Sequence, residues 1–303
     1  MSPLLLDLQE VIKDYDGKRA VDRVSFPLQR GAIFGMLGPN GAGKTSLIRI
    51  ITSITRADSG QVLFNGEALR EKHSERMGYM PEERGLYKKM KIGDHLIYLA
   101  RLKGMSHAEA RKALVGWMEK FDIMDWWPKK IEELSKGMQQ KIQFIVTVLH
   151  KPELIILDEP FSGLDPINAN LIKDEILELN RQGATLIFST HRMEQVEEIC
   201  SEIVLINNGK NVLQGRVRDI KNTYKENLFS LEFADRVPSS LPPDFDMEAL
   251  GEARMRVRLK PGQSSRELLL WLLNQGHALT AFQEILPSLN DIFIKRVGEA
   301  NLG

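Results

Sequence analysis

A glycine-rich string that ends in a lysine and a threonine is the segment of this sequence with the clearest chemistry. Gly38-Pro39-Asn40-Gly41-Ala42-Gly43-Lys44-Thr45 matches the pattern G-x-x-x-x-G-K-[ST] at every fixed position, and Ser46 follows it. Glycines allow backbone angles at which successive N–H groups surround a phosphate. Lys44 would reach the outer phosphates of a nucleotide, and the Thr45 hydroxyl would ligate Mg²⁺. We therefore predict that residues 38–46 bind nucleotide phosphates.

Two adjacent carboxylates form the second candidate group. Asp158 and Glu159 end an apolar run over 154–157, and Pro160 follows them. Asp158 is placed to hold Mg²⁺ through water, as in other phosphate-loop enzymes. Glu159 could orient or deprotonate an attacking water. A solvated acidic turn would explain this pair if it stood alone, but beside the glycine string it predicts hydrolysis of a bound nucleotide.

The predicted elements place both groups at strand ends. The glycine pattern alone would arise by chance in roughly one chain in a hundred of this length, so its setting matters. A buried strand is predicted over 32–37 directly before it, and a helix over 46–51 directly after it. A helix N-terminus at that point adds its dipole to phosphate binding. The strand over 154–157 carries the carboxylates in the same way.

Strands and helices alternate over most of residues 1–215, which predicts an α/β domain with a mostly parallel core sheet. Three successive helices interrupt this order and predict an inserted helical subdomain at about 86–150. From about residue 216 the pattern of strands and helices changes again, and we predict an accessory α+β domain over 216–303. The further elements expected are strands at 24–28, 61–64, 77–80, 185–188 and 252–260, a hairpin of 202–206 with 211–213, and helices at 94–103, 108–121, 138–150, 168–180, 193–200, 264–275 and 289–297.

Composition excludes several classes of protein. Basic and acidic residues number 41 each, and this balance argues weakly against a nucleic acid held by counterion release. Cys200 is the single cysteine, so no internal disulfide is expected. Residues 1–10 predict a strand rather than a signal peptide, and the longest apolar run, 268–273, is too short to span a membrane. Any membrane role would come through a partner.

A further segment resembles a family signature. Leu134-Ser135-Lys136-Gly137-Met138-Gln139-Gln140 begins 24 residues before Asp158 and resembles the Leu-Ser-Gly-Gly-Gln motif of ATP-binding-cassette (ABC) proteins. Ser135 also suits a simple helix N-cap. Three more segments resemble the family in order and spacing, namely Ser162-Gly163-Leu164-Asp165 as the D-loop, His191 as the switch histidine, and Tyr15 as the aromatic residue that stacks on adenine.

This resemblance covers residues 4 to about 215 and implies a nucleotide-binding domain that works as a dimer. Two copies would pack head to tail with two ATP molecules and Mg²⁺ between them. Closure would then depend on ATP, and hydrolysis would release it. Each site would take Lys44, Thr45, Asp158, Glu159 and His191 from one copy and Ser135 and Gly137 from the other.

Several positions depart from the usual family pattern, and one of the segments that contain them resembles a particular branch of the family. Lys136 and Met138 replace signature residues, and Glu82 stands where the family has a glutamine that ligates Mg²⁺. A carboxylate still binds a hard cation, so we expect Glu82 as a metal ligand. The stretch 81–87, Pro-Glu-Glu-Arg-Gly-Leu-Tyr, resembles the sodium-efflux branch of type-2 exporters, and residues 286–293 resemble the closing helix of their accessory domain.

The resemblance implies an ATPase subunit on the cytoplasmic face of the cell membrane. Its partners would be a second subunit, most simply an identical one, and a polytopic permease that exports sodium ions or a drug-like substrate. One alternative is an ABC ATPase of a translation or DNA-repair machine, but no second phosphate loop and no sustained heptads occur. Another is a module without turnover, against which Glu159 and His191 both speak. The accessory domain could stabilise the dimer, regulate it or contact the membrane subunit, and stabilisation is the simplest of these roles.

Overall fold

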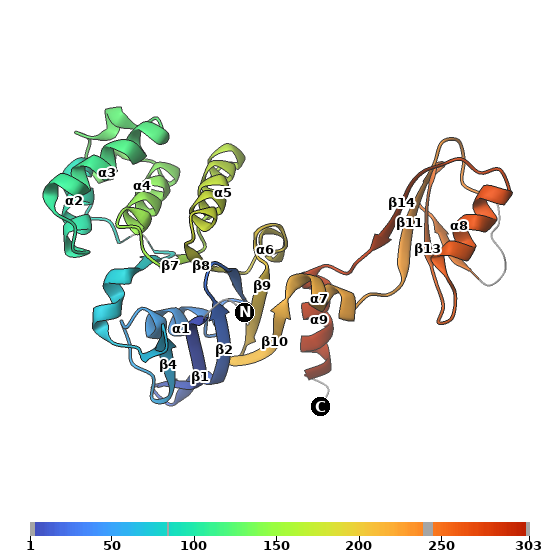
Figure 1. Ribbon diagram of the computed structural model, residues 1–303, viewed down its shortest axis with the longest axis horizontal. Coiled ribbons are helices and arrows are strands. Elements are labelled where there is room, and N and C mark those ends of the chain that lie inside the picture. The colour runs from blue at the N-terminus through green and yellow to red at the C-terminus, as the bar shows by residue number, and fades with distance from the viewer. Residues whose placement is uncertain (1–3, 84, 239–244, 301–303) are drawn as a thin grey trace. The chain divides into compact units, whose positions relative to one another are not determined.

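The computed structural model describes residues 4–83, 85–238 and 245–300, so Arg84 of the 81–87 stretch lies outside the described residues. The chain forms two compact units, Met1–Val217 and Arg218–Gly303, which divide two residues beyond the boundary expected from sequence. Each unit has its own sheets and helices (Figure 1).

A six-stranded sheet forms the core of the first unit. Its order is β10-β9-β3-β8-β7-β6, in which all neighbours are parallel except the antiparallel edge strand β10. Strands β3, β7 and β8 are buried along their whole length, which explains their unbroken apolar sequences. The strands are β3 Ile33–Leu37, β6 Met77–Met80, β7 Leu154–Asp158, β8 Thr185–Thr190, β9 Glu202–Asn207 and β10 Lys210–Arg216.

A second, antiparallel sheet shares the apolar core of the first. Its order is β2-β1-β4-β5, with β1 Leu4–Tyr15, β2 Lys18–Gln29, β4 Ser59–Phe64 and β5 Glu67–Ala68. One continuous cluster of buried side chains joins both sheets to helix α1 (Lys44–Ile51). Within it the rings of Phe26 and Phe34 stack with centroids 5.1 Å apart. This shared core fixes β1 and β2 relative to the end of β3, where the glycine string begins.

Helices α2 Ile92–Leu102, α3 His107–Lys120 and α4 Lys136–Val148 form the inserted helical part, drawn in greens in Figure 1. Each begins one or two residues earlier than sequence predicts. For α3 the reason is a capping box, in which Ser106 and Glu109 bind each other's backbone N–H. The aromatic rings of Trp117, Phe121 and Phe144 pack α3 against α4. Helices α5 Pro166–Arg181 and α6 Met193–Ile199 follow β7 and β8.

The second unit is built on a four-stranded antiparallel sheet of order β12-β13-β11-β14. Its strands are β11 Leu228–Phe233, β12 Asp246–Ala249, β13 Arg254–Arg258 and β14 Leu279–Ile285. Leu268 and Leu272 of α8 (Ser265–Asn274) complete a small core with the buried side chains of β11 and β13. Helices α7 Val217–Thr223 and α9 Leu289–Ala300 flank the sheet in the sequence. The structure thus confirms the predicted α/β class of the chain.

Candidate active site

The glycine string forms the loop between β3 and α1. Gly38, Gly41 and Gly43 all have positive φ angles, of 150°, 78° and 107°. A Cβ atom on Gly38 would lie 2.1 Å from the carbonyl oxygen of Ile206, and one on Gly43 would lie 2.3 Å from that of Ala20. Only glycine combines this conformation with this close approach of neighbouring backbone. The loop geometry therefore depends on Gly38 and Gly43.

The side chain of Lys44 folds back over this loop. Its Nζ donates hydrogen bonds to the carbonyl oxygens of Gly38 at 2.7 Å and Pro39 at 3.0 Å. Burial lowers the pKa of Lys44, and the negative charges of Glu159 and Asp158 oppose that change. The ammonium group is thus held at the centre of the loop, where an incoming phosphate would meet it.

Asp158 lies buried at the end of β7 beside this ammonium group. The Ser189 hydroxyl of β8 donates a 2.8 Å hydrogen bond to its Oδ1. Burial raises the pKa of Asp158, and the nearby Glu82 carboxylate raises it further. A divalent cation would favour the ionised form of such a carboxyl. With the oxygen atoms of Thr45 and Glu82 in the same cavity, the donor set fits Mg²⁺.

Glu159 and His191 form a hydrogen-bonded pair. The Nδ1 and backbone N of His191 lie 2.6 and 2.9 Å from Oε1 of Glu159, and the Thr190 hydroxyl donates to Oε2 at 3.0 Å. Glu159 is a non-glycine residue with φ of 51°, and its N–H binds the Ser189 carbonyl at 2.9 Å. The left-handed backbone and these donors fix the direction of a carboxylate that could accept a proton from water.

Most of the predicted residues line one cavity of about 440 Å³. Tyr15 lines this cavity, as do Lys18, Arg19 and Ala20, which sequence reasoning did not predict. Gly38, Pro39 and His191 stand outside the lining and contact it through Lys44 and Glu159. The other predicted residues that line the cavity are Asn40, Gly41, Ala42, Gly43, Lys44, Thr45, Ser46, Glu82, Asp158 and Glu159.

Several residues of this site escape sequence reasoning. Asn208 and Gly209 line the cavity, although the sequence marks them only as a hairpin turn. Two glutamines of α4 bind the segments that carry the carboxylates: Gln143 Nε2 donates to the Pro81 carbonyl at 2.6 Å, and Gln140 Nε2 to the Pro160 carbonyl at 2.9 Å. The signal available for the glutamines was their place one helical turn apart on a buried face.

The structure does not bring Ser135 and Gly137 to the glycine string of the same chain. They line a separate cavity of about 510 Å³ that shares no lining residue with the first. Ser135 caps α4 there, and its Oγ accepts a hydrogen bond from the Met138 N–H at 3.3 Å. Lys136 and Asp165 line the same cavity. That these residues serve another copy's nucleotide stays a prediction.

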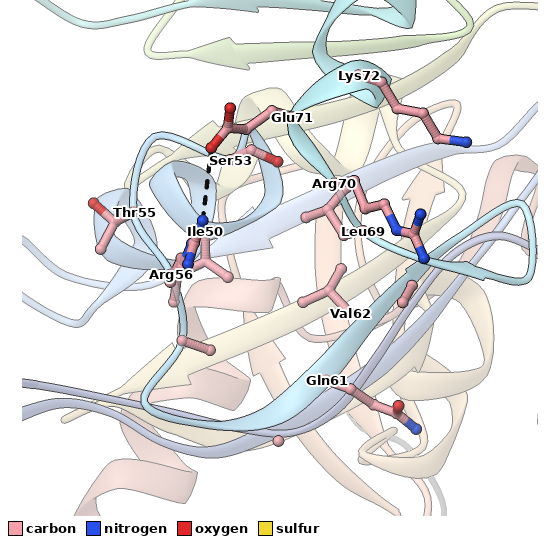
Figure 2. Close-up of a pocket in the computed structure, with 13 residues that line it drawn as sticks. Ile50, Ser53, Thr55, Arg56, Gln61, Val62, Leu69, Arg70, Glu71 and Lys72 are labelled. Atoms are coloured by element: carbon pink, nitrogen blue, oxygen red, sulfur yellow. Dashed lines mark ion pairs between the residues drawn. The ribbon is translucent and has the colours of Figure 1, made fainter.

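A larger hollow of about 650 Å³ at the end of α1 has different chemistry (Figure 2). Its lining includes the apolar side chains of Ile50, Val62 and Leu69 and the ion pair of Arg56 with Glu71, whose atoms are 3.8 Å apart. It shares no residue with the glycine string or the carboxylate pair. The volume of a cavity therefore does not identify the nucleotide site, whereas the chemistry of its lining residues does.

Comparison with known proteins assigns the family. The model of the ABC transporter family matches residues 21–162, and that of the C-terminal domain of ATP-binding proteins like DrrA1-3 matches 215–297. The uncharacterized ABC transporter ATP-binding protein YhaQ of Bacillus subtilis is 42% identical over 296 residues, which is 97% of this chain and 99% of YhaQ. The chain belongs to the ABC transporter ATP-binding proteins.

One further relative and one solved structure are similar to this ABC subunit. Nod factor export ATP-binding protein I of Burkholderia thailandensis is 34% identical over 223 residues, 73% of each chain. A solved ATP-binding subunit of an ABC transporter superposes with a TM-score of 0.68 at 29% identity and covers 73% of this chain and 93% of its own. The ABC subunit therefore binds ATP and, as its family does, hydrolyses it to drive transport.

Within residues 4–83, 85–238 and 245–300, this ABC subunit has no helix with the length and apolar character needed to cross a bilayer.

Proposed function

We propose that this ABC subunit binds Mg-ATP in the 440 Å³ cavity and hydrolyses it there, as one half of a dimer that drives a polytopic membrane permease. The observation that carries the proposal is the meeting of Lys44, Asp158 and the Glu159–His191 pair at one cavity. Lys44 supplies a cation that binds phosphate, Asp158 supplies a metal ligand, and the Glu159–His191 pair supplies a general base.

The chemistry follows from these positions. Thr45, Glu82 and Asp158 would hold Mg²⁺, which offsets phosphate charge when bound. Glu159 takes a proton from water while the water oxygen bonds to the γ-phosphorus. The bond from that phosphorus to the bridging oxygen breaks, and its electron pair leaves with ADP. His191 holds the Glu159 carboxylate through Nδ1, and Lys44 binds the phosphate oxygens.

Dimerisation is proposed because one chain holds only half of the expected site. Ser135 and Gly137 lie in their own cavity, and Lys44 lies in the other. Two identical copies placed head to tail would bring each signature helix to the partner's nucleotide. An identical partner is the simplest arrangement, since a two-fold axis completes both sites with one interface.

Export is the proposed direction of transport. The supporting observations are the likeness to a Nod factor export ATP-binding protein and the Pro81–Tyr87 stretch, whose Glu82 lines the cavity. The substrate class we propose is a sodium ion or a drug-like molecule. The subunit would act at the cytoplasmic face of the cell membrane, without a nucleic-acid partner.

The variant Glu159→Gln tests the catalytic assignment. It retains the size of the side chain and loses the base, so we expect Mg-ATP binding within a few-fold of wild type and hydrolysis slower by about 100-fold or more. Phosphate release and equilibrium ATP binding measure the two effects. Undiminished turnover would remove Glu159 from the role of base.

The same variant can trap the partner. Affinity purification from detergent-solubilised membranes with Mg-ATP should recover a polytopic membrane protein. Recovery of ribosomes, nucleic acid or soluble proteins instead would favour the alternative of a non-transport ABC ATPase.

A further inference from the structure

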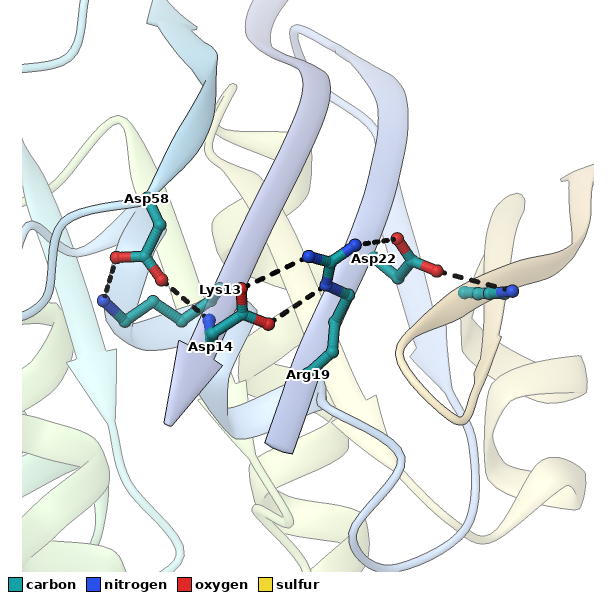
Figure 3. A network of polar contacts seen from close by, with 6 residues as sticks. Lys13, Asp14, Arg19, Asp22 and Asp58 are labelled. Carbon is teal, nitrogen blue, oxygen red and sulfur yellow. Dashed lines mark hydrogen bonds and ion pairs between the residues drawn. The ribbon is translucent and has the colours of Figure 1, made fainter. Parts of the chain in front are cut away.

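A lysine outside the nucleotide cavity covers the ring of Tyr15. The Lys13 Nζ lies 5.4 Å from the centroid of the Tyr15 ring. Tyr15 lines the cavity, whereas Lys13 and Asp58 do not. The same Nζ lies 2.7 Å from Oδ1 of Asp58. The carboxylate of Asp58, one residue before β4, therefore holds this cation, and Figure 3 shows the pair of Lys13 with Asp58.

The chain around Lys13 is fixed by the same carboxylate. The second oxygen of Asp58 accepts a 2.7 Å hydrogen bond from the backbone N–H of Asp14. This backbone bond is the main cause, and Lys13 the next, of a lowered pKa of Asp58. Asp58 thus binds the Lys13 side chain and the Asp14 backbone, and these two residues directly precede Tyr15 at the end of β1.

A second group of ions continues along the cavity wall. The Nε and Nη2 of Arg19 donate to Asp14 at 3.0 and 3.4 Å, and its Nη1 donates to Asp22 at 3.3 Å. Asp22 also pairs with Lys210 at 3.4 Å (Figure 3). The backbone N–H of Asp22 binds the carbonyl of Gly209, which itself lines the cavity. The network therefore joins the end of β1 and the start of β2 to the start of β10 and the turn before it.

The ion pairs of this network contribute little to the stability of the fold. The side chains of Arg19 and Asp14 are 47% and 43% exposed, and exposed pairs contribute only about 0–1 kcal/mol. The Lys13 side chain differs, since only 14% of it is exposed. Among the described residues, no other aromatic ring is stacked on Tyr15, whose own exposure is 38%. The Lys13 cation thus lies over a ring that is more than one-third exposed.

We propose that Lys13, held by Asp58, is a positioning residue that fixes the Tyr15 ring for stacking on the base of the bound nucleotide. The inference rests on the proposed ATP site. The ammonium group lies over the ring, and Tyr15, which is 38% exposed, also lines the cavity where a purine would stack on it. A ring fixed before binding loses less conformational freedom when the ligand arrives, which strengthens binding of ligands that carry a base.

The variant Lys13→Met tests this role, because it retains the apolar stem and removes the charge. We expect the Kd for Mg-ATP to rise about 3- to 10-fold, in the range of one cation–ring contact. The Kd for Mg-tripolyphosphate should stay within about 2-fold, because this probe fills the glycine loop and has no base. Asp58→Asn should weaken ATP binding in the same selective way.

Two further variants locate the effect. Tyr15→Ala should weaken ATP binding by about tenfold or more, as loss of base stacking does. Lys13→Met added to Tyr15→Ala should then cause no further loss, because Lys13 acts through the ring. The matched control is Lys72→Met, which removes a lysine paired with Glu67 at 3.2 Å outside the cavity and should leave both affinities unchanged.

Three results would overturn the inference. They are an unchanged ATP affinity in Lys13→Met and Asp58→Asn, an equal loss of ATP and tripolyphosphate binding, and additive losses in the double variant. Failure of the wild-type protein to bind ATP would instead refute the proposed function itself.

Discussion

At the scale of single residues, Glu159 shows how backbone strain and chemistry coincide. A left-handed conformation costs a non-glycine residue about 1–3 kcal/mol unless its surroundings impose it. Here the N–H of Glu159 binds β8, and three donors from Thr190 and His191 hold its carboxylate. The strain thus turns a side chain at a strand end back towards the cavity rather than out into solvent.

His95 is a second residue whose environment has a measurable consequence. It is fully buried in α2, and neither ring nitrogen has a hydrogen-bond partner among the described residues. Burial lowers the pKa of His95 to about 4. The folded protein therefore keeps this ring neutral at pH values where the unfolded chain, with a pKa near 6.5, takes up a proton.

This difference predicts that stability falls as pH drops from about 6.5 towards 4. At about 1.4 kcal/mol per pKa unit, His95 would account for roughly 2 kcal/mol between pH 7 and pH 5. In His95→Leu the loss of unfolding free energy over that range should shrink by about this amount. Urea unfolding at both pH values measures it. His150, with a pKa also near 4, retains its share in the variant, and an identical pH dependence would contradict the prediction.

At the scale of elements, the loop between β3 and α1 is the most constrained part of the site. Gly43→Ala would force a Cβ to within 2.3 Å of the Ala20 carbonyl at a φ of 107°. We expect the Kd for ATP to rise by about tenfold or more, since the loop must shift. Gly31→Ala is the matched control, because its φ is 77° but its Cβ would meet open space. Gly31→Ala should lose stability without losing ATP binding, and equal losses of binding would contradict the assignment.

Elements with an apolar run, a clear period or a glycine motif were predictable from sequence, and elements without such a signal were not. The buried strands β3, β7 and β8 and the phosphate loop could be placed from apolar runs and glycine spacing. Strand β12 was missed because all four of its side chains are exposed, so that no alternation exists. Strand β14 was missed for a similar reason, since its burial follows no period of two.

In the candidate site, the residues that belong to local motifs were predictable, and the residues that hold them in place were not. Lys44, Asp158 and Glu159 belong to local motifs, so residue types and spacing were sufficient. The contacts of Gln143 with Pro81, and of Asp58 with Lys13, join residues more than forty positions apart. Their partners depend on sheet order and helix packing, which a single sequence does not specify.

At the scale of the whole molecule, the two separate cavities predict complementation between damaged copies. Lys44→Ala and Ser135→Ala should each be nearly inactive as homodimers. In a mixed dimer both lesions fall on one site and leave the other intact, so an equal mixture should regain roughly a quarter of wild-type hydrolysis if pairing is random. Phosphate release by the mixture measures this recovery. An inactive mixture whose subunits are shown to exchange would place Lys44 and Ser135 in one chain's site.

The same separation of the two cavities also affects how the rate of ATP hydrolysis depends on subunit concentration. If Ser135 serves the partner's nucleotide as proposed, a lone chain has no complete site, because its Lys44 and Ser135 face different cavities. At low concentration hydrolysis should then grow with the square of subunit concentration. A membrane partner that binds two copies raises their effective concentration to the millimolar range. Hydrolysis would then be confined to the assembled transporter, and dispersed subunits would leave the cell's ATP untouched.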